Sequence, residues 1–217
     1  KMRLATEADN VPLESLAPCA PEPPEDMLNE VFTAVDAISR EDLRALMRKL
    51  LDDVGEVLPY FPAASKLHHA ERSGLLHHMT GMLRMAMHYA DEYPSLDRDL
   101  LVAGVVAHDL PKTGELNASK MGTVSDYTAD GLLLGHLVRG VARIDAAGRE
   151  TGCDEEILMM LEHMVLSHHG VPEYGSPRPP MFPEAEVLHH LDVVDARIFE
   201  MNAALAKVQP GGFSERL

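Results

Sequence analysis

Apolar side chains recur every three to four residues along most of the chain, which predicts a succession of amphipathic helices. The first such stripe consists of Met27, Val31, Ala34, Val35 and Ile38. On this spacing we expect helices over residues 26–38, 43–54, 68–89, 98–110, 129–147, 155–167 and 184–208. No segment alternates convincingly between apolar and polar positions. The pattern therefore predicts an all-α bundle of about six or seven helices.

Capping residues and prolines indicate where the middle helices begin and end. Asp97 is expected to cap the helix over 98–110, and Pro111 is one reason for that helix to stop. The polar stretch 112–128 is expected to form a loop. One continuous helix is then expected over 129–147.

The last predicted helix carries two neighbouring stripes. The stripe expected to face the core consists of Val187, Leu191, Val194 and Ile198. The stripe beside it consists of Leu188, Asp192, Asp195 and Phe199. Because the second stripe is apolar at both ends, we expect it to be at least partly buried. An acid such as Asp192 then needs a partner, which is either an arginine or a metal ion.

The chain divides into three predicted parts. Residues 1–25 are rich in proline and acidic side chains, as in VPLESLAPCAPEPPE, and are expected to form an extended linker or arm. Residues 26–208 form the helical domain, and residues 209–217 a flexible tail. A chain that opens on such an arm is expected to be a fragment, or a shortened relative, of something longer.

Composition narrows the class of protein. The formal net charge of -16 argues against a broad basic face that follows a phosphate backbone. Two cysteines in 217 residues do not make a disulfide scaffold, so a reducing compartment is expected. There is no apolar run long enough for a transmembrane helix, and the first residues do not resemble a signal peptide. We expect a cytoplasmic protein with no membrane association.

Histidine is the unusual component. The chain has 12 histidines, and eight of them form adjacent pairs at 68–69, 77–78, 168–169 and 189–190. The stretch LVAGVVAHDLPKTGEL places His108 and Asp109 together at the end of an apolar helix, with Lys112 just beyond. An imidazole and a carboxylate together suit a divalent transition metal, and a carboxylate can bridge two metals. Alone, this pair also fits an ordinary capped helix end.

Four further helices each offer one comparable group. His78 lies on the side of Leu75 and Met82, whereas His77 points more outward. The other candidates are His136, His168 or His169, and Asp192. Taken singly, each also fits a packed helix histidine, a solvated helix end or an ion pair. Together they indicate a metal site, because one shared metal centre would satisfy several buried polar groups that are costly when left unpaired.

The order H…HD…D on an all-α scaffold resembles the HD-domain metal-dependent phosphohydrolase superfamily. The blocks AASKLHHAERSGLLHHMTGML, LLVAGVVAHDLPKTGEL, DYTADGLLLGHLVRGV and VLSHHGVPEYGSPRPPMFPEAEVLHHLDVVDARI are similar to the HD domain of the YhaM-type 3'-5' exoribonuclease family. The likeness spans roughly residues 62–198. Members of that family carry an OB-fold domain before the HD domain, so residues 1–25 are expected to be the exit from such a domain.

The resemblance implies a ligand set and several further roles. The implied metal ligands are His78, His108, Asp109, His136, His168 and Asp192. Asp109 would bridge two metals and His169 is the alternative to His168. Lys112 would act with Asp109 in catalysis by stabilising charge on phosphoryl oxygens. The candidates for substrate binding are Lys112, His169, Arg72 and Arg178.

Two departures from the family pattern concern the same site. The family usually has glycine where this chain has Pro111, which makes the placing of Lys112 less certain. It commonly has an acidic residue where this chain has His77. His69 lies on the far side of one straight helix from His78, but it would fold back over the site if the helix began nearer Gly74.

The resemblance implies a phosphohydrolase. It would cleave phosphodiester or phosphomonoester bonds of RNA or single-stranded DNA 3' ends, or of nucleotides or cyclic dinucleotides, through a metal-activated hydroxide. Two divalent metal ions are implied, and Fe, Mn, Zn, Co and Ni all suit such ligands. The alternative is a non-catalytic HD-type signalling or interaction module. The complete ligand set favours the enzyme.

Overall fold

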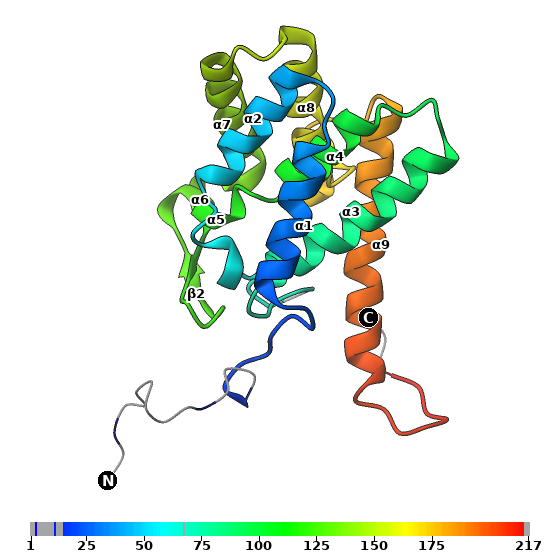
Figure 1. The fold of residues 1–217 in the computed structure, drawn as a ribbon. Helices are drawn as coiled ribbons and strands as arrows, with labels where there is room; N and C mark the ends of the chain where they lie inside the picture. Colours follow the sequence, from blue (N-terminus) through cyan, green and yellow to red (C-terminus); the bar gives the residue numbers. More distant parts are fainter. Residues whose placement is uncertain (1–2, 4–10, 12–14, 67, 215–217) are drawn as a thin grey trace.

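The computed structural model describes residues 3, 11, 15–66 and 68–214, and over these residues the chain forms a bundle of helices (Figure 1). The helices of ten residues or more in this part are α1 (Pro24–Asp36), α2 (Glu41–Asp52), α3 (Gly74–Glu92), α4 (Arg98–Ala107), α7 (Gly135–Thr151), α8 (Glu155–Ser167) and α9 (Pro183–Leu205). Short 3-10 turns occur at Leu58–Tyr60 (η3) and Pro172–Tyr174 (η4). The all-α prediction is confirmed.

Helix α4 is the buried centre of the bundle. Every residue from 100 to 111 is buried, and α2, α3, α8 and α9 all pack against α4. A helix that is surrounded on all sides has to be apolar all round, which explains the run LVAGVVA. Gly104 allows α8 to come close, because a Cβ at this position would lie 2.2 Å from Cε of Met164. The packing therefore carries the end of α4 into the interior.

Acidic residues cap the starts of α4 and α8, and the cap of α4 is the predicted one. The side chain of Asp97 accepts a hydrogen bond from Leu100 N–H at the start of α4. Asp154 accepts from the N–H groups of Glu156 and Ile157 at the start of α8. Each cap satisfies backbone donors that have no partner inside the helix. The two helices that end near the site thus have defined starting points.

The stretch 112–128, which we expected to be a loop, contains regular structure. Helix α5 spans Lys112–Glu115, and the antiparallel strands β1 (Leu116–Ala118) and β2 (Val124–Tyr127) follow as a hairpin. Leu116 is the one buried residue of the two strands. Strands this short and this exposed carry no period-two pattern that a sequence reading can detect.

The single helix expected over 129–147 is divided in two. Helix α6 (Ala129–Leu133) ends before Gly135, whose φ of 70° lies in the left-handed region that favours glycine. Leu132 and Leu133 are 70% and 82% exposed, so they do not form a buried face. His136 consequently lies in the first turn of a new helix, α7, and not in the middle of a long one.

The boundary of α3 also differs from the prediction, since the helix begins at Gly74 and not at residue 68. His69 and Ser73 have φ values of 51° and 63°, which bend the chain before the helix. A Cβ on Gly74 would lie 2.0 Å from the carbonyl oxygen of His69, so glycine permits this close approach. The condition under which His69 could fold back toward His78 is therefore met.

The core face of α9 is not the predicted one. Leu188 and Leu191 are buried, whereas Val194 and Ile198 are 43% and 53% exposed. The later part of α9 extends past the end of the bundle (Figure 1), so no element covers that stripe among the described residues. The stripe that contains Asp192 and Asp195 is the one that turns inward, as their contacts with His78 show.

The two ends of the chain are described only in part. Of the predicted arm, residues 1–2, 4–10 and 12–14 lie outside the described residues, as do residues 215–217 of the predicted tail. Residues near position 19 attach to the loop before α3, where Ala20 N–H donates to Arg72 O and Arg72 N–H donates to Pro18 O, both at 2.9 Å. Among the described helices, none has the length and apolar character needed to cross a membrane.

We expect Leu101→Ala to lower the free energy of unfolding by about 2–5 kcal/mol, because Leu101 is 1% exposed in α4 and its loss leaves a cavity at the centre. The matched control Leu133→Ala removes a side chain that is 82% exposed and should change stability by less than about 0.5 kcal/mol. Urea unfolding followed by circular dichroism measures both. Equal effects would contradict the central role of α4.

Candidate metal centre

Five helices bring the six predicted ligands to one place. His78 lies in α3, His108 and Asp109 follow α4, and His136 begins α7. His168 follows α8, and Asp192 lies in α9. His78, His108, Asp109 and His168 are at most 2% exposed, which makes this a buried polar centre.

Two of the histidines are oriented by their own helices. His108 is the C-terminal cap of α4, and its Nδ1 lies 2.8 Å from the carbonyl oxygen of Val105. His168 caps α8 in the same way, with Nδ1 2.7 Å from the carbonyl oxygen of Val165. A carbonyl can only accept, so Nδ1 carries the proton in each ring. Nε2 then presents a lone pair, which is the form that binds a metal.

Two other histidines are oriented by carboxylates. Nδ1 of His78 lies 2.7 Å from Oδ2 of Asp195, and Nδ1 of His136 lies 3.0 Å from Oε2 of Glu115. Glu115 also accepts the backbone N–H of His136 at 3.2 Å. A carboxylate behind an imidazole fixes the ring and raises its basicity as a ligand. The neutral form of each ring therefore directs Nε2 inward.

Asp109 lies between two groups of these nitrogens. Its Oδ2 is 3.8 Å from Nε2 of His78 and 3.5 Å from Nε2 of His108. Its Oδ1 is 3.7 Å from Nε2 of His136 and 3.8 Å from Nε2 of His168. One carboxylate thus offers a different oxygen to each group. Asp192 adds a second carboxylate, with Oδ1 3.4 Å from Nε2 of His78.

The donor atoms fit divalent metal ions. Nε2 of His136 and of His168 are buried and have no hydrogen-bond partner in the structure. Nε2 of His78 and of His108 lie 3.2 Å apart, a contact that requires a proton or a cation between them. Two ligands bound to one ion at about 2.0–2.2 Å are separated by roughly 3.0–3.5 Å, close to the spacings found here. The buried lone pairs and their spacing support metal binding.

Burial and neighbouring charges shift the pKa values of the groups at the centre. Burial lowers the pKa of His108, and lowers that of His168 well below its usual value, so both rings are neutral at pH 7. Burial would raise the pKa of Asp109, but Lys112 and the neighbouring histidines hold it well below its usual range. Burial also disfavours a charged His78, yet hydrogen bonds to Asp192 and Asp195 raise its pKa to about 9. A metal ion at His78 therefore has to displace a proton.

Pro111 is compatible with the position of Lys112. Its φ of -66° is the value that the proline ring enforces, and Lys112 N–H donates to Asp109 O at 3.0 Å to close the turn. The ammonium group of Lys112 lies 2.6 Å from Oδ2 of Asp109. Burial lowers the pKa of Lys112, but the attraction of Asp109 outweighs it and raises the pKa overall. Lys112 is therefore a charged group at the centre.

The predicted substrate-binding residues fall in two places. His169 contacts the loop after α8, with Nδ1 2.8 Å from the carbonyl oxygen of Tyr174, and Arg178 is exposed further along that loop. Arg72 is directed elsewhere, since its Nε donates to Lys120 O at 3.2 Å in the turn between β1 and β2. His169 can join His136 and His168 in binding a metal. The substrate contacts of all three candidates stay predictions.

Three residues of the site received no role from the sequence. Asp195 and Glu115 supply the carboxylates behind His78 and His136, and only the separation of three residues between Asp192 and Asp195 pointed to the same helix face. His68 also lies at the centre, with its ring centroid 5.8 Å from that of His78. Burial, aided by the charge of Lys112, lowers the pKa of His68 to about 4 and keeps it neutral.

Comparison with known proteins identifies relatives of the chain. The family model of the HD domain matches residues 75–197. A "3'-5' exoribonuclease YhaM" of Bacillus licheniformis is 43% identical over 216 residues, which cover 100% of this chain and 68% of the relative. Proteins of the same name from Geobacillus sp. and Bacillus subtilis are 43% and 41% identical over 217 residues, covering 66% and 68% of the relative. No solved structure matches the chain.

We expect Asp195→Asn to weaken binding of divalent metal ions by about 10–100-fold, because His78 loses the carboxylate that orients it. Calorimetric titration of the chelator-treated protein with Mn²⁺ measures the affinity. Asp91→Asn is the matched control, since Asp91 is 64% exposed and pairs with Arg98 on the surface. Identical affinities for the two variants would show that Asp195 does not support the centre.

Proposed function

The chain belongs to the HD-domain family and is a relative of the YhaM exoribonucleases, and on this premise we propose that it is a metal-dependent phosphohydrolase that acts on the 3' ends of RNA. The observation that carries the proposal is the position of Asp109, whose two oxygens face two separate groups of imidazole nitrogens. A carboxylate in that position can bridge two ions, as two-metal phosphoryl chemistry requires.

The proposed ligands divide between two ions. His78, His108, Asp109 and Asp192 would hold the first ion. Asp109, His136 and His168 would hold the second ion, with His169 as a further ligand or a substrate contact. The groupings His78–His108–Asp109 and His136–His168–His169, each with ligand atoms within 4.8 Å of one another, support this division. His108, His168 and Asp192 form another such grouping, so the two sets of ligands adjoin each other. Histidine with carboxylate suits Fe, Mn, Zn, Co or Ni.

Each residue has a defined task in hydrolysis. When bound, the metal ions supply Lewis acidity toward phosphoryl oxygens and lower the pKa of a water molecule, so that a hydroxide nucleophile is present at neutral pH. Asp109 lies between the two groups of ligands and offers one carboxylate oxygen to each group. Lys112 places a positive charge beside Asp109, where it can stabilise charge that develops on the phosphate. The burial of the centre keeps these interactions strong by excluding water.

The properties of this chain suit a substrate that is the end of a nucleic-acid strand. The relatives are named 3'-5' exoribonucleases, which supports RNA and the 3' direction. The net charge of -16 opposes contact with a long stretch of backbone, so we propose that the chain binds only the terminal nucleotides. His169 and Arg178 are the proposed contacts to these nucleotides. Arg72 instead donates a hydrogen bond to the turn of the hairpin.

We also propose two further features that the sequence predicts. They are the division into an arm (1–25), a domain (26–208) and a tail (209–217), and the cytoplasmic location. The non-catalytic alternative is disfavoured, because every predicted ligand is present at the centre.

We expect Asp109→Ala to remove the bridging ligand and to lower hydrolysis of single-stranded RNA by about a thousandfold or more, which corresponds to several kcal/mol of lost transition-state stabilisation. Nucleotide release from end-labelled RNA measures the rate, and elemental analysis measures bound metal. Asp145→Ala is the matched control, as Asp145 pairs with Arg149 on the surface.

A circular RNA of the same sequence tests the direction of attack, since it has no 3' end. Its cleavage at the rate of the linear RNA would contradict the proposed exonuclease. A fully active Asp109→Ala variant would contradict the metal mechanism.

We expect Lys112→Ala to lower kcat by about 10²–10³-fold while the metal content stays unchanged, because the lysine contacts the bridging carboxylate and not the ligand nitrogens. The exposed Lys207 provides the matched control, and Lys207→Ala should leave kcat unaltered. Steady-state kinetics and elemental analysis distinguish the two roles. Loss of metal in Lys112→Ala at unchanged kcat per bound metal would assign Lys112 a structural role.

A further inference from the structure

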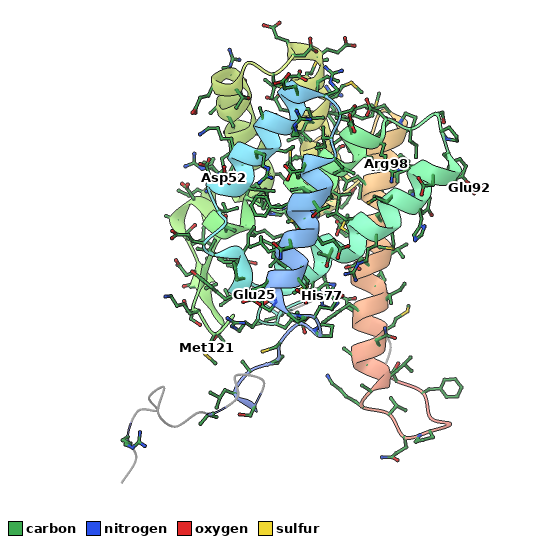
Figure 2. The ribbon with its side chains drawn as sticks, viewed as in Figure 1. Glu25, Asp52, His77, Glu92, Arg98 and Met121 are labelled. Atoms are coloured by element: carbon green, nitrogen blue, oxygen red, sulfur yellow. The ribbon has the colours of Figure 1, made fainter. Side chains whose placement is uncertain are left out.

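A second cluster of possible ligands lies at the N-terminal end of α3, outside the centre around Asp109. It consists of His69, Glu71 and His77, and Figure 2 labels His77 at this end of the helix. The side chains of His69, Glu71 and His77 are 3%, 12% and 23% exposed, so a small ion can reach the cluster while most of it is shielded. None of the three is a ligand in the proposed function.

The loop before α3 is built in a way that brings these side chains together. His69 and Ser73 both have positive φ, a conformation that costs energy in residues other than glycine. Ser73 Oγ donates to Pro59 O at 2.6 Å, and Ala63 N–H donates to His69 O at 3.1 Å. These bonds maintain the bent backbone, so His69 and Glu71 face His77 in the first turn of the helix.

The hydrogen bond of His69 determines which nitrogen it offers. Nε2 of His69 lies 2.8 Å from Oδ2 of Asp195, a carboxylate oxygen that can only accept. In the neutral ring the proton is therefore on Nε2, and Nδ1 carries the lone pair. That lone pair faces Nδ1 of His77 at 3.1 Å. The arrangement is the one found at His78 and His108, where two imidazole nitrogens also approach each other.

The three ligand atoms are spaced like one face of a tetrahedral metal site. Oε1 of Glu71 is 2.8 Å from Nδ1 of His77 and 3.7 Å from Nδ1 of His69. Four ligands at about 2.0–2.2 Å from a zinc ion are separated by roughly 3.3–3.5 Å. The spacings of the cluster scatter around this value. Two histidines and a glutamate are also a ligand set that zinc uses in proteins.

We propose that His69, Glu71 and His77 form a third cation site, which binds Zn²⁺ or a similar divalent transition metal through two Nδ1 atoms and one carboxylate oxygen. A water molecule or another small ligand completes the coordination. The site is separate from the two ions around Asp109 and does not depend on the proposed hydrolysis.

Asp195 connects the third site to the centre. Its Oδ2 accepts hydrogen bonds from both Nε2 of His69 and Nδ1 of His78. A cation on Nδ1 of His69 polarises that ring and strengthens its bond to Asp195, which in turn holds His78. The ring of Phe199 packs on the ring of His69, with centroids 4.1 Å apart, and shields the hydrogen bond between His69 and Asp195 from water. The ion at the third site thus supports a ligand of the metal centre.

The competing occupant of the cluster is a proton on Nδ1 of His77, shared by Glu71 and His69. Titration of the chelator-treated full chain with Zn²⁺, followed by gel filtration and elemental analysis, distinguishes a metal from a proton. We expect three ions per wild-type chain and two in His77→Ala. The conservative variant Glu71→Gln should lower the affinity for the third ion by more than about tenfold. Circular dichroism verifies that each variant is folded.

Two controls separate this site from the others. His190 makes a surface pair with Glu186 at 3.1 Å, and His190→Ala should retain all three ions. Asp109→Ala should lose the ions of the centre but keep the third, so a failure of the proposed function leaves this test intact. The inference is overturned if folded His77→Ala and Glu71→Gln bind as many ions as the wild type with equal affinity. It is also overturned if Asp109→Ala binds none.

Discussion

A neutral imidazole presents its lone pair on Nε2 only when Nδ1 carries the proton, and the whole centre depends on hydrogen-bond acceptors that hold the proton on Nδ1. The carbonyls of Val105 and Val165 accept hydrogen bonds from Nδ1–H of His108 and His168. The carboxylates of Asp195 and Glu115 accept hydrogen bonds from Nδ1–H of His78 and His136. The inward nitrogens then surround Asp109. Four rings from four helices are therefore oriented as the proposed ligands by acceptors that lie outside the proposed metal centre.

Burial makes the negative charges of this centre costly unless they are compensated. Asp109 and its neighbours occupy the end of a helix with no exposed residue between 100 and 111, where an unpaired charge is costly. Lys112 compensates one negative charge, and a proton on His78 compensates another. Divalent cations neutralise more charge and also satisfy the lone pairs of His136 and His168. The low exposure of the site is thus consistent with metal ions as its natural counter-charges.

The sequence predicted those parts of the molecule that depend on helical periodicity. The phase of α3 correctly predicted that His78 faces inward and that His77 points more outward. The apolar run before His108 correctly predicted a buried helix. The prediction was wrong where a backbone conformation decides. Examples are the break at Gly135 and the strained turn at His69, since both need a φ that periodicity does not report.

Long-range pairing was the other limit. Asp195 lies 117 residues from His78 in the chain, so no local pattern relates the two. The exposed face of α9 was assigned to the core for a similar reason. Val194 and Ile198 have the right spacing, but whether another element covers them depends on where the helix leaves the bundle. Periodicity describes a helix face and cannot identify its neighbour.

The different origins of the proton acceptors have a consequence for how the site assembles. His108 and His168 acquire the correct tautomer as soon as their own helix ends form, because the acceptor is three residues away. His78 and His136 acquire it only when α9 and the segment before the hairpin have docked. The first pair belongs to secondary structure and the second to tertiary structure. Metal binding is therefore thermodynamically linked to docking, so a chelator should loosen the packing of α3 and α9 while most of the helical content persists.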